Sequence, residues 1–196
     1  MQLKNLIIRN SVSLIDEKKE VVKVVETPFA PFTRIWCSHE AECLSKLAEL
    51  GFVGAPRLIG ASGNRLTMQM LDGRSLNGHL VIDEEMFRRV LGVVHRLHEL
   101  GFAHGNLRPS NIRITDEGEV ALIDFETCCQ RGNPLFFLAR FSDQVRLHLL
   151  WKSTVAPFVP TPEVMFFPKR MILAMYLITP LNRCTRSLRA IKKCIR

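Results

Sequence analysis

The chain has 196 residues, of which 47% are hydrophobic and 23% charged, an ordinary globular composition that suffices for one domain or two small lobes. Its formal net charge of +8 favours acidic partners such as nucleotide phosphates, anionic lipid or nucleic acid, although a solvated basic surface would give the same value. The best apolar stretch, residues 171–181, is too short for the ~20 residues of a membrane-spanning helix, and the first residues lack the apolar run of a signal peptide, so we expect a non-secreted, cytoplasmic protein.

The N-terminal residues have the pattern of β-strands. Apolar residues at 6–8 and alternating apolar residues at Val12 and Leu14 precede a polar turn at 16–19 and an apolar, β-branched run at 21–25. Lys23 interrupts this last run. A lysine in such a place is commonly found at a sheet edge, facing water, and the alternative is a functional lysine.

Residues 27–36 contain two prolines and are expected to form a loop, after which Ser38 would cap a helix over residues 39–50. Gly51 would end that helix. Its apolar residues recur at helical spacing and predict one buried face: Ala41, Leu44, Leu47 and Ala48.

Two further strands are predicted at residues 56–60 and 65–70, and the turn at 71–73 would lead the chain out of the sheet. Asp83 would cap the next helix, residues 84–100, and Gly101 would end it. Its apolar residues also recur at helical spacing: Phe87, Val90, Leu91, Val94 and Leu97.

A turn-rich stretch follows at residues 104–112, where a proline and two asparagines favour a loop that projects polar groups. Two short apolar runs around a turn, residues 112–115 and 120–123, predict a β-hairpin. Its open end would bring together the amide oxygen of Asn111 and the carboxylate of Asp124. Such oxygen ligands suit Mg²⁺, which is commonly held by one or two protein groups together with substrate phosphates.

Residues 104–112 and 121–126 together resemble the catalytic loop and the Asp-Phe-Gly segment of the protein-kinase superfamily. The order and the spacing of the motif residues both fit. Because a typical protein kinase is longer, the resemblance is to a compact bacterial branch, RIO-like or lipopolysaccharide-kinase-like. It implies an α+β, bilobal fold with a small antiparallel N-lobe containing one helix, residues 1–71, and a reduced, mainly helical C-lobe, residues 72–196.

The resemblance also implies a role for several residues. Lys23 would contact the phosphates of ATP, and Glu40 would orient Lys23 through an ion pair. Glu42 is the rival partner. The structural alternative is that Glu40 is simply a glutamate in the first turn of a helix, where the helix dipole favours it. The turn at 71–73 would be the hinge that contacts adenine through backbone groups, which places Met70 and Asp72 beside the nucleotide. Asn111 and Asp124 would hold Mg²⁺.

Two residues depart from the family pattern in the catalytic segments. Asn106 stands in place of the catalytic aspartate, and Glu126 in place of the usual glycine. Asn106 would therefore position an acceptor hydroxyl without serving as a base, and Arg108 would face the γ-phosphate. Glu126 would recruit a second Mg²⁺ or point to solvent.

The family's glycine-rich loop is also missing. No glycine precedes Gly51, and residues 10–13 occupy the place of that loop. Its absence weakens the expectation of nucleotide binding without removing it.

The rest of the chain is predicted to be helical. A helix is expected from about residue 135 to 152, in which Asp143 either accepts backbone hydrogen bonds from the catalytic loop, as the resemblance implies, or is a plain surface residue. Residues 169–196 contain no acidic residue and predict a basic amphipathic helix, which would pack on the core or contact an anionic membrane from the cytoplasmic side. The six cysteines show no CxxC or zinc-ligand spacing and are expected to be reduced.

Three hypotheses for function remain open. The first is an ATP- and Mg²⁺-dependent phosphotransferase with a protein, sugar or small-molecule acceptor. The second is a pseudokinase, a binding or regulatory module, which Asn106 and the missing glycine-rich loop favour. The third, a nucleic-acid-binding protein, depends on the net charge alone, since no nucleic-acid-binding motif is present.

Overall fold

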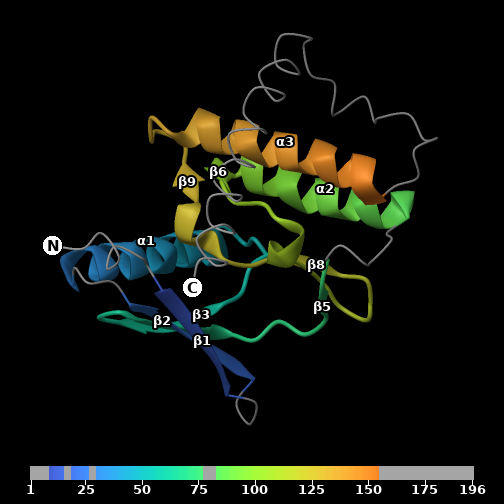
Figure 1. Cartoon of the computed structure of the whole chain (residues 1–196). Coiled ribbons are helices and arrows are strands. Elements are labelled where there is room, and N and C mark those ends of the chain that lie inside the picture. The colour runs from blue at the N-terminus through green and yellow to red at the C-terminus, as the bar shows by residue number, and fades with distance from the viewer. Residues whose placement is uncertain (1–8, 16–18, 27–29, 77–82, 155–196) are drawn as a thin grey trace, which may run out of the picture. The chain divides into compact units, whose positions relative to one another are not determined.

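The computed structural model of the chain describes residues 9–15, 19–26, 30–76 and 83–154, which all belong to one compact unit. Figure 1 shows the arrangement of its helices and strands. Four strands, β1 (Arg9–Ile15), β2 (Glu20–Glu26), β3 (Leu58–Ser62) and β4 (Arg65–Gln69), form an antiparallel sheet in the order β1-β2-β4-β3. The expected strand at 6–8 and the basic helix at 169–196 lie outside the described residues.

Lys23 lies in an interior strand and not at a sheet edge. β2 runs between β1 and β4, and in this register Lys23 pairs with Val12 on one side and Leu66 on the other. Both Lys23 and Leu66 are buried. Residues 10–13 are part of β1, so they do not form a loop in the place of the glycine-rich segment.

Helix α1 (Ala30–Glu49) begins nine residues earlier than the sequence predicted. The expected loop over residues 27–36 was wrong from residue 30 onward, because Pro31 falls in the first turn of the helix, where a missing N–H breaks no hydrogen bond. Ser38 is therefore inside the helix and does not cap it. The apolar face is confirmed at Leu44 and Leu47, whereas Ala48 is exposed.

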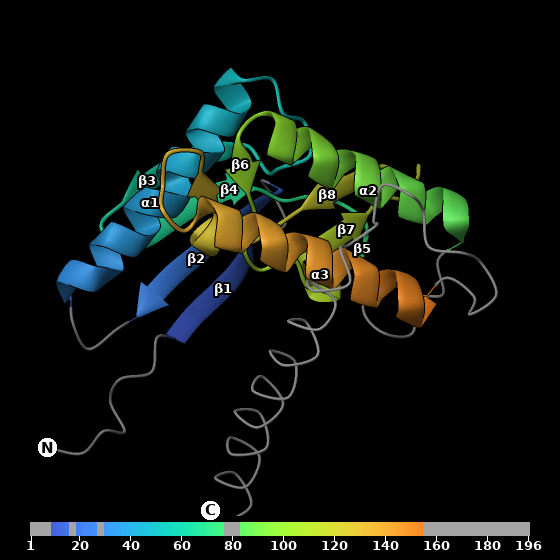
Figure 2. The same cartoon turned by 90° about the horizontal axis from the view of Figure 1, so that it is seen from above.

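The C-terminal end of α1 follows the sequence prediction. Gly51 adopts a φ of +69°, its N–H donates to the carbonyl of Ala48, and the next N–H, of Phe52, donates to Leu47. This pair of bonds is a Schellman motif, which satisfies the last carbonyls of the helix. α1 packs against β2, β3 and β4, as the view in Figure 2 shows.

The chain changes sheets between residues 69 and 74. β5 (Arg74–Ser75) no longer pairs with the first sheet and joins β7 (Ile112–Ile114) and β8 (Val120–Leu122) in a second one. Gly73, with a φ of +93°, passes so close to this sheet that a Cβ atom would lie 2.2 Å from the carbonyl oxygen of Ile114. The expected turn at 71–73 is therefore a crossing between two sheets, while the lobe limits 1–71 and 72–196 stay a prediction.

Two long helices complete the second half. α2 (Glu84–Glu99) is capped as expected by Asp83, whose side chain accepts a hydrogen bond from the N–H of Met86 at 2.8 Å. It lies beside α3 (Phe136–Thr154), as Figure 1 shows. The rings of Phe87 and Trp151 meet edge to face across the two helices, with centroids 4.8 Å apart. None of the described helices has both the length and the apolarity needed to cross a bilayer.

β7 and β8 confirm the predicted hairpin. Short elements connect this hairpin to the helices. They are β6 (Phe102–Ala103), η3 (Pro109–Asn111), η4 (Phe125–Thr127) and β9 (Cys129–Gln130), and β6 pairs with β9. The turn-rich stretch thus begins after β6 and ends in η3, directly before the hairpin.

Candidate active site

Lys23 is the centre of the site. Its Nζ lies 2.8 Å from Oε2 of Glu40, 2.6 Å from Oδ1 of Asp124 and 3.3 Å from Oε2 of Glu126. Burial disfavours the charge of Lys23, but the attraction of Glu40 and Asp124 outweighs it and holds the pKa of Lys23 above its usual range. The lysine is therefore a fixed positive charge shared by three carboxylates.

Glu40 joins α1 to the segment after the hairpin. Its Oε2 accepts from Lys23 while its Oε1 accepts from the backbone N–H of Phe125 at 3.1 Å. Burial raises the pKa of the Glu40 carboxyl, and the charge and hydrogen bond of Lys23 oppose that shift. The rival Glu42 is exposed and pairs with Lys46 at 2.6 Å, one turn further along α1.

Asn111 and Asp124 converge at the open end of the hairpin, as the sequence predicted, but the nitrogen of the Asn111 amide, and not its oxygen, faces the carboxylate. Nδ2 of Asn111 lies 3.5 Å from Oδ2 of Asp124 and donates to the backbone carbonyl of Asn106 at 2.9 Å. The backbone helps to fix this pair, because the N–H of Ile123 donates to the carbonyl of Asn111. Asp124 has a left-handed conformation, φ 70° and ψ 64°, which aspartate tolerates better than most residues.

The donor set at this end of the hairpin fits Mg²⁺. One carboxylate and one amide side chain lie together, and the Asp124 side chain is 29% exposed, so solvent and a substrate phosphate have room to supply other ligands. In the described part of the chain, three or more His, Cys, Asp or Glu side chains do not gather in a metal-binding group.

The loop before η3 is fastened from two sides. Asp143 of α3 is completely buried and accepts from the backbone N–H groups of His104 at 2.7 Å and Gly105 at 2.9 Å. The side chain of His98 also lies 3.1 Å from Asp143. Asp143 is therefore the acceptor that the resemblance implied and not a surface residue.

His104 has a single tautomer that fits its partners. Its Nε2 lies 3.0 Å from the carbonyl oxygen of Ile123, which can only accept, so Nε2 carries the proton. Its Nδ1 then accepts from the backbone N–H of Asn106 at 3.3 Å. Burial lowers the pKa of His104, which keeps the ring neutral and makes it a structural link between the loop and the hairpin.

The remaining predicted residues lie apart from the lysine cluster. Asn106 is half-buried and Arg108 is exposed. The described hydrogen bonds and ion pairs of Lys23 do not include these two residues, nor Met70 or Asp72. The N–H of Met70 is already bonded to the carbonyl of Lys19 at 2.8 Å, so an adenine contact at this residue would use its carbonyl. The exposed side chain of Asp72 is paired with that of Lys19 at 3.5 Å.

Sequence reasoning did not foresee the contact of Glu126 with Lys23. A carboxylate two residues after Asp124 was visible, but its direction depends on η4, a single turn that no pattern in the sequence announces. The pairing of His98 with Asp143 was missed as well, because it joins α2 to α3.

Comparison with known proteins identifies the family. The sequence matches the RIO domain family over residues 12–141, which is more than half of the chain. The chain belongs to the RIO domain family. This family match confirms that the chain resembles the protein-kinase superfamily, and with it the predicted bilobal, α+β fold class of this RIO domain.

Two solved structures show the same fold. The Rio2 kinase of Chaetomium thermophilum, solved as an ADP/Mg²⁺-phosphoaspartate complex, has a TM-score of 0.62 and 17% identity, covering 79% of this chain and 56% of that one. WbdD, solved with the kinase inhibitor LY294002, has a TM-score of 0.51 and 20% identity, covering 81% and 41%.

The curated relatives are protein kinases. Sperm motility kinase 2B of Mus musculus is 34% identical over 68 residues, 31% of this chain and 14% of that protein. The serine/threonine-protein kinase WAG1 of Arabidopsis thaliana is 27% identical over 129 residues, 64% of this chain and 24% of that protein. This RIO domain thus spans about a quarter or less of the length of these curated kinases.

Proposed function

We propose that this RIO domain is an ATP- and Mg²⁺-dependent phosphotransferase. The observation that carries the proposal is the position of Lys23, which contacts Glu40 of α1 and Asp124 after the hairpin at the same time. Lys23 is the buried cation in this cluster, and an incoming phosphate can compete for it with the carboxylates. The Rio2 kinase was solved with ADP and Mg²⁺, which supports the same ligands here.

Each residue has a part in the proposed reaction. Glu40 holds Lys23 in place through one oxygen and the chain after Asp124 through the other. Lys23 binds phosphate oxygens, and exposed Arg108 is available to neutralise charge on the transferred group. Asn111 and Asp124 hold Mg²⁺, which when bound neutralises phosphate charge and orients the phosphates.

Asn106 limits the rate of this chemistry. Its amide orients an acceptor hydroxyl but does not take up a proton near neutral pH, and general-base assistance is worth about 10²–10⁴-fold. Phosphoryl transfer depends mainly on positioning and on charge neutralisation, because its transition state is loose. We therefore propose slow transfer to a hydroxyl acceptor of a protein, a sugar or a small molecule.

A pseudokinase is the second candidate, and two observations favour it. Asn106 removes the base, and the contacts of Lys23 with three carboxylates oppose an incoming polyphosphate of the same sign as those groups. In that case the fold would serve as a binding module in the cytoplasm. Contact of residues 169–196 with an anionic membrane stays a prediction, because that segment lies outside the described residues.

The first experiment is thermal unfolding of the protein with ATP, in Mg²⁺ and then in EDTA. A ligand at about 100 times its dissociation constant adds roughly 2.7 kcal/mol to the free energy of unfolding, so a shift of several degrees is expected with Mg²⁺. Asp124→Ala should abolish the Mg²⁺-dependent part. Asp116→Ala is the matched control, because Asp116 lies at the other end of the same hairpin with an 84% exposed side chain.

The outcomes separate the two candidates. Binding accompanied by phosphate release that disappears in Lys23→Met supports the phosphotransferase, whereas Mg²⁺-dependent binding without release supports the pseudokinase. An unchanged midpoint at millimolar ATP would rule out the nucleotide site and with it the proposed transfer.

A further inference from the structure

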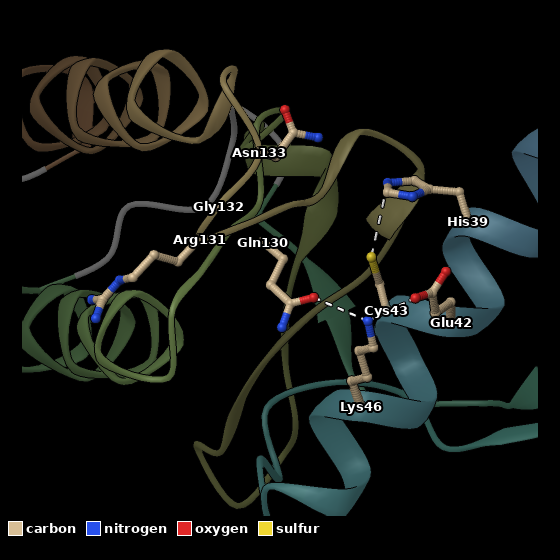
Figure 3. Close-up of a pocket in the computed structure, with 8 residues that line it drawn as sticks. All are labelled: His39, Glu42, Cys43, Lys46, Gln130, Arg131, Gly132 and Asn133. Carbon is tan, nitrogen blue, oxygen red and sulfur yellow. Dashed lines mark hydrogen bonds and ion pairs between the residues drawn. The ribbon is translucent and has the colours of Figure 1, made fainter.

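A pocket lies beside α1, and Lys23 is not among the residues that line it. Its volume is about 310 Å³, and it is lined by His39, Glu42, Cys43 and Lys46 of α1 and by residues 130–133, which begin at the end of β9. Figure 3 shows Cys43 with its sulfur directed towards the His39 ring. The pocket thus gives small molecules a route to a thiol that is otherwise only 5% exposed.

Two polar groups lie beside the sulfur of Cys43, the His39 ring and the Cys128 thiol, while the carboxylates of Glu42 and Glu40 oppose a negative charge there. Nε2 of His39 lies 2.7 Å from the carbonyl oxygen of Cys128, so this nitrogen carries the proton, and it also lies 3.8 Å from Sγ of Cys43. The thiol of Cys128 is a further hydrogen-bonding partner of Cys43. Donors around a sulfur stabilise the thiolate, which is the reactive form.

The other described cysteines have less reactive surroundings. The Cys128 thiol lowers the pKa of Cys43 despite burial, whereas burial raises the pKa of both Cys37 and Cys129. The pKa of Cys128 is raised by its hydrogen bond with Cys43 and by burial. Among the cysteines that the structure describes, Cys43 is therefore the one favoured as a thiolate.

We propose that Cys43 and Cys128 form an oxidation site, in which a small hydroperoxide that enters the pocket converts the two thiols into a disulfide. The Cys43 thiolate attacks a peroxide oxygen, an S–O bond forms, the O–O bond breaks, and the departing oxygen leaves as water or alcohol. Cys128 then attacks the oxidised sulfur, an S–S bond forms and the S–O bond breaks, and the oxygen leaves as water with the proton of Cys128.

Burial determines the order of these steps. Cys43 lines the pocket, whereas Cys128 has no exposed surface and is reached through Cys43. The disulfide would join α1, which carries Glu40 one turn before Cys43, to a residue four positions after Asp124. Oxidation would thus tie together two parts of the chain that hold Lys23, and the proposal does not depend on phosphoryl transfer.

The test is peptide mapping of the reduced, full-length protein after exposure to hydrogen peroxide and blocking of the remaining thiols with N-ethylmaleimide. The expected product is a peptide pair linked through Cys43 and Cys128. In Cys128→Ser the expected product is a sulfenic acid at Cys43, which dimedone traps. In the unoxidised protein, Cys43 should react with N-ethylmaleimide faster than Cys37, because Cys43 lines the pocket and the pKa of Cys43 is lowered whereas that of Cys37 is raised.

Cys129→Ser is the matched control, since Cys129 is the chain neighbour of Cys128 and directs its thiol to the carbonyl of Thr127. This variant should retain the Cys43–Cys128 link. Links that involve Cys37 or Cys129 in preference to Cys43, or no link at peroxide levels that oxidise free cysteine, would overturn the proposal. The wild-type map and Cys128→Ser decide the matter even where Cys43→Ser does not fold.

Discussion

The ammonium nitrogen of Lys23 lies 2.6 Å from Oδ1 of Asp124, although 101 positions of sequence separate the two residues. The other oxygen of the same carboxylate, Oδ2, faces the amide of Asn111. Asp124 therefore links the cation of the four-stranded sheet to the open end of the hairpin. A single side chain therefore connects the candidate metal ligands to the lysine proposed to bind phosphate.

Replacing Lys23 should cost much of the stability of the protein. Lys23→Met leaves the buried carboxylate of Glu40 without its partner, and breaking a buried pair in this way typically costs about 3–5 kcal/mol. Lys23→Met combined with Glu40→Gln should recover part of the loss, as measured by urea unfolding in a double-mutant cycle. Lys19→Met is the control, because its ion pair with Asp72 is exposed and should contribute less than about 1 kcal/mol.

His104 should make the protein sensitive to acid. Its pKa is lowered in the folded state by burial, so the unfolded chain binds more protons below its ordinary pKa of about 6.5, and stability falls as the pH falls through that value. One such group changes the free energy of unfolding by at most about 1.4 kcal/mol per pH unit. Denaturant unfolding between pH 7.5 and 5 should show a steeper decline for the wild type than for His104→Gln, and parallel curves would contradict the assignment.

Gly105 should tolerate no side chain. Its φ is +75°, and a Cβ atom would lie 2.5 Å from the carbonyl oxygen of Thr127, so Gly105→Ala should destabilise the protein by at least about 2 kcal/mol. Gly92→Ala is the opposite case, because Gly92 lies in the interior of α2 with open space around it. That change should stabilise by about 0.5–1 kcal/mol. Urea midpoints of the two variants should move in opposite directions.

Asn106→Asp should increase the rate of phosphate release from ATP if the proposed function holds. A carboxylate at this position supplies the missing base, worth about 10²–10⁴-fold. Asn133→Asp is the control, because it makes the same change in charge outside the site. Asn133 is exposed and accepts a hydrogen bond from the N–H of Leu135, and an aspartate carboxylate can accept the same bond. A rate for Asn106→Asp no higher than that of the wild type, with Mg²⁺ and ATP bound by both, would show that the base is not what limits turnover.

Local patterns predicted the local structure. The hairpin around residues 112–122, the capped helix α2 and the glycine that ends α1 followed from short-range chemistry that no distant contact changed. The start of α1 did not follow, because proline is compatible both with a loop and with a first helical turn.

The distances in the site were not predictable in the same way. The motif spacing anticipated that Asn111 and Asp124 converge, since a hairpin brings its two ends together. The third carboxylate on Lys23, from Glu126, and the contact of Cys43 with Cys128 both join segments far apart in the chain. Such contacts depend on tertiary packing, such as that of α1 against η4, and no periodicity along the sequence records that packing.

The register of β2 has a consequence for how this chain can vary in length. Lys23 stands opposite Leu66 in this register, and its side chain contacts Glu40. Successive residues of a strand point to opposite faces of the sheet, so only every second position of β2 lies on the face of Glu40. A single inserted residue between Glu20 and Lys23 would turn the lysine to the far side of the sheet and empty the site, with no change in composition. Insertions and deletions inside β2 should therefore abolish function, even where the composition of the strand is unchanged.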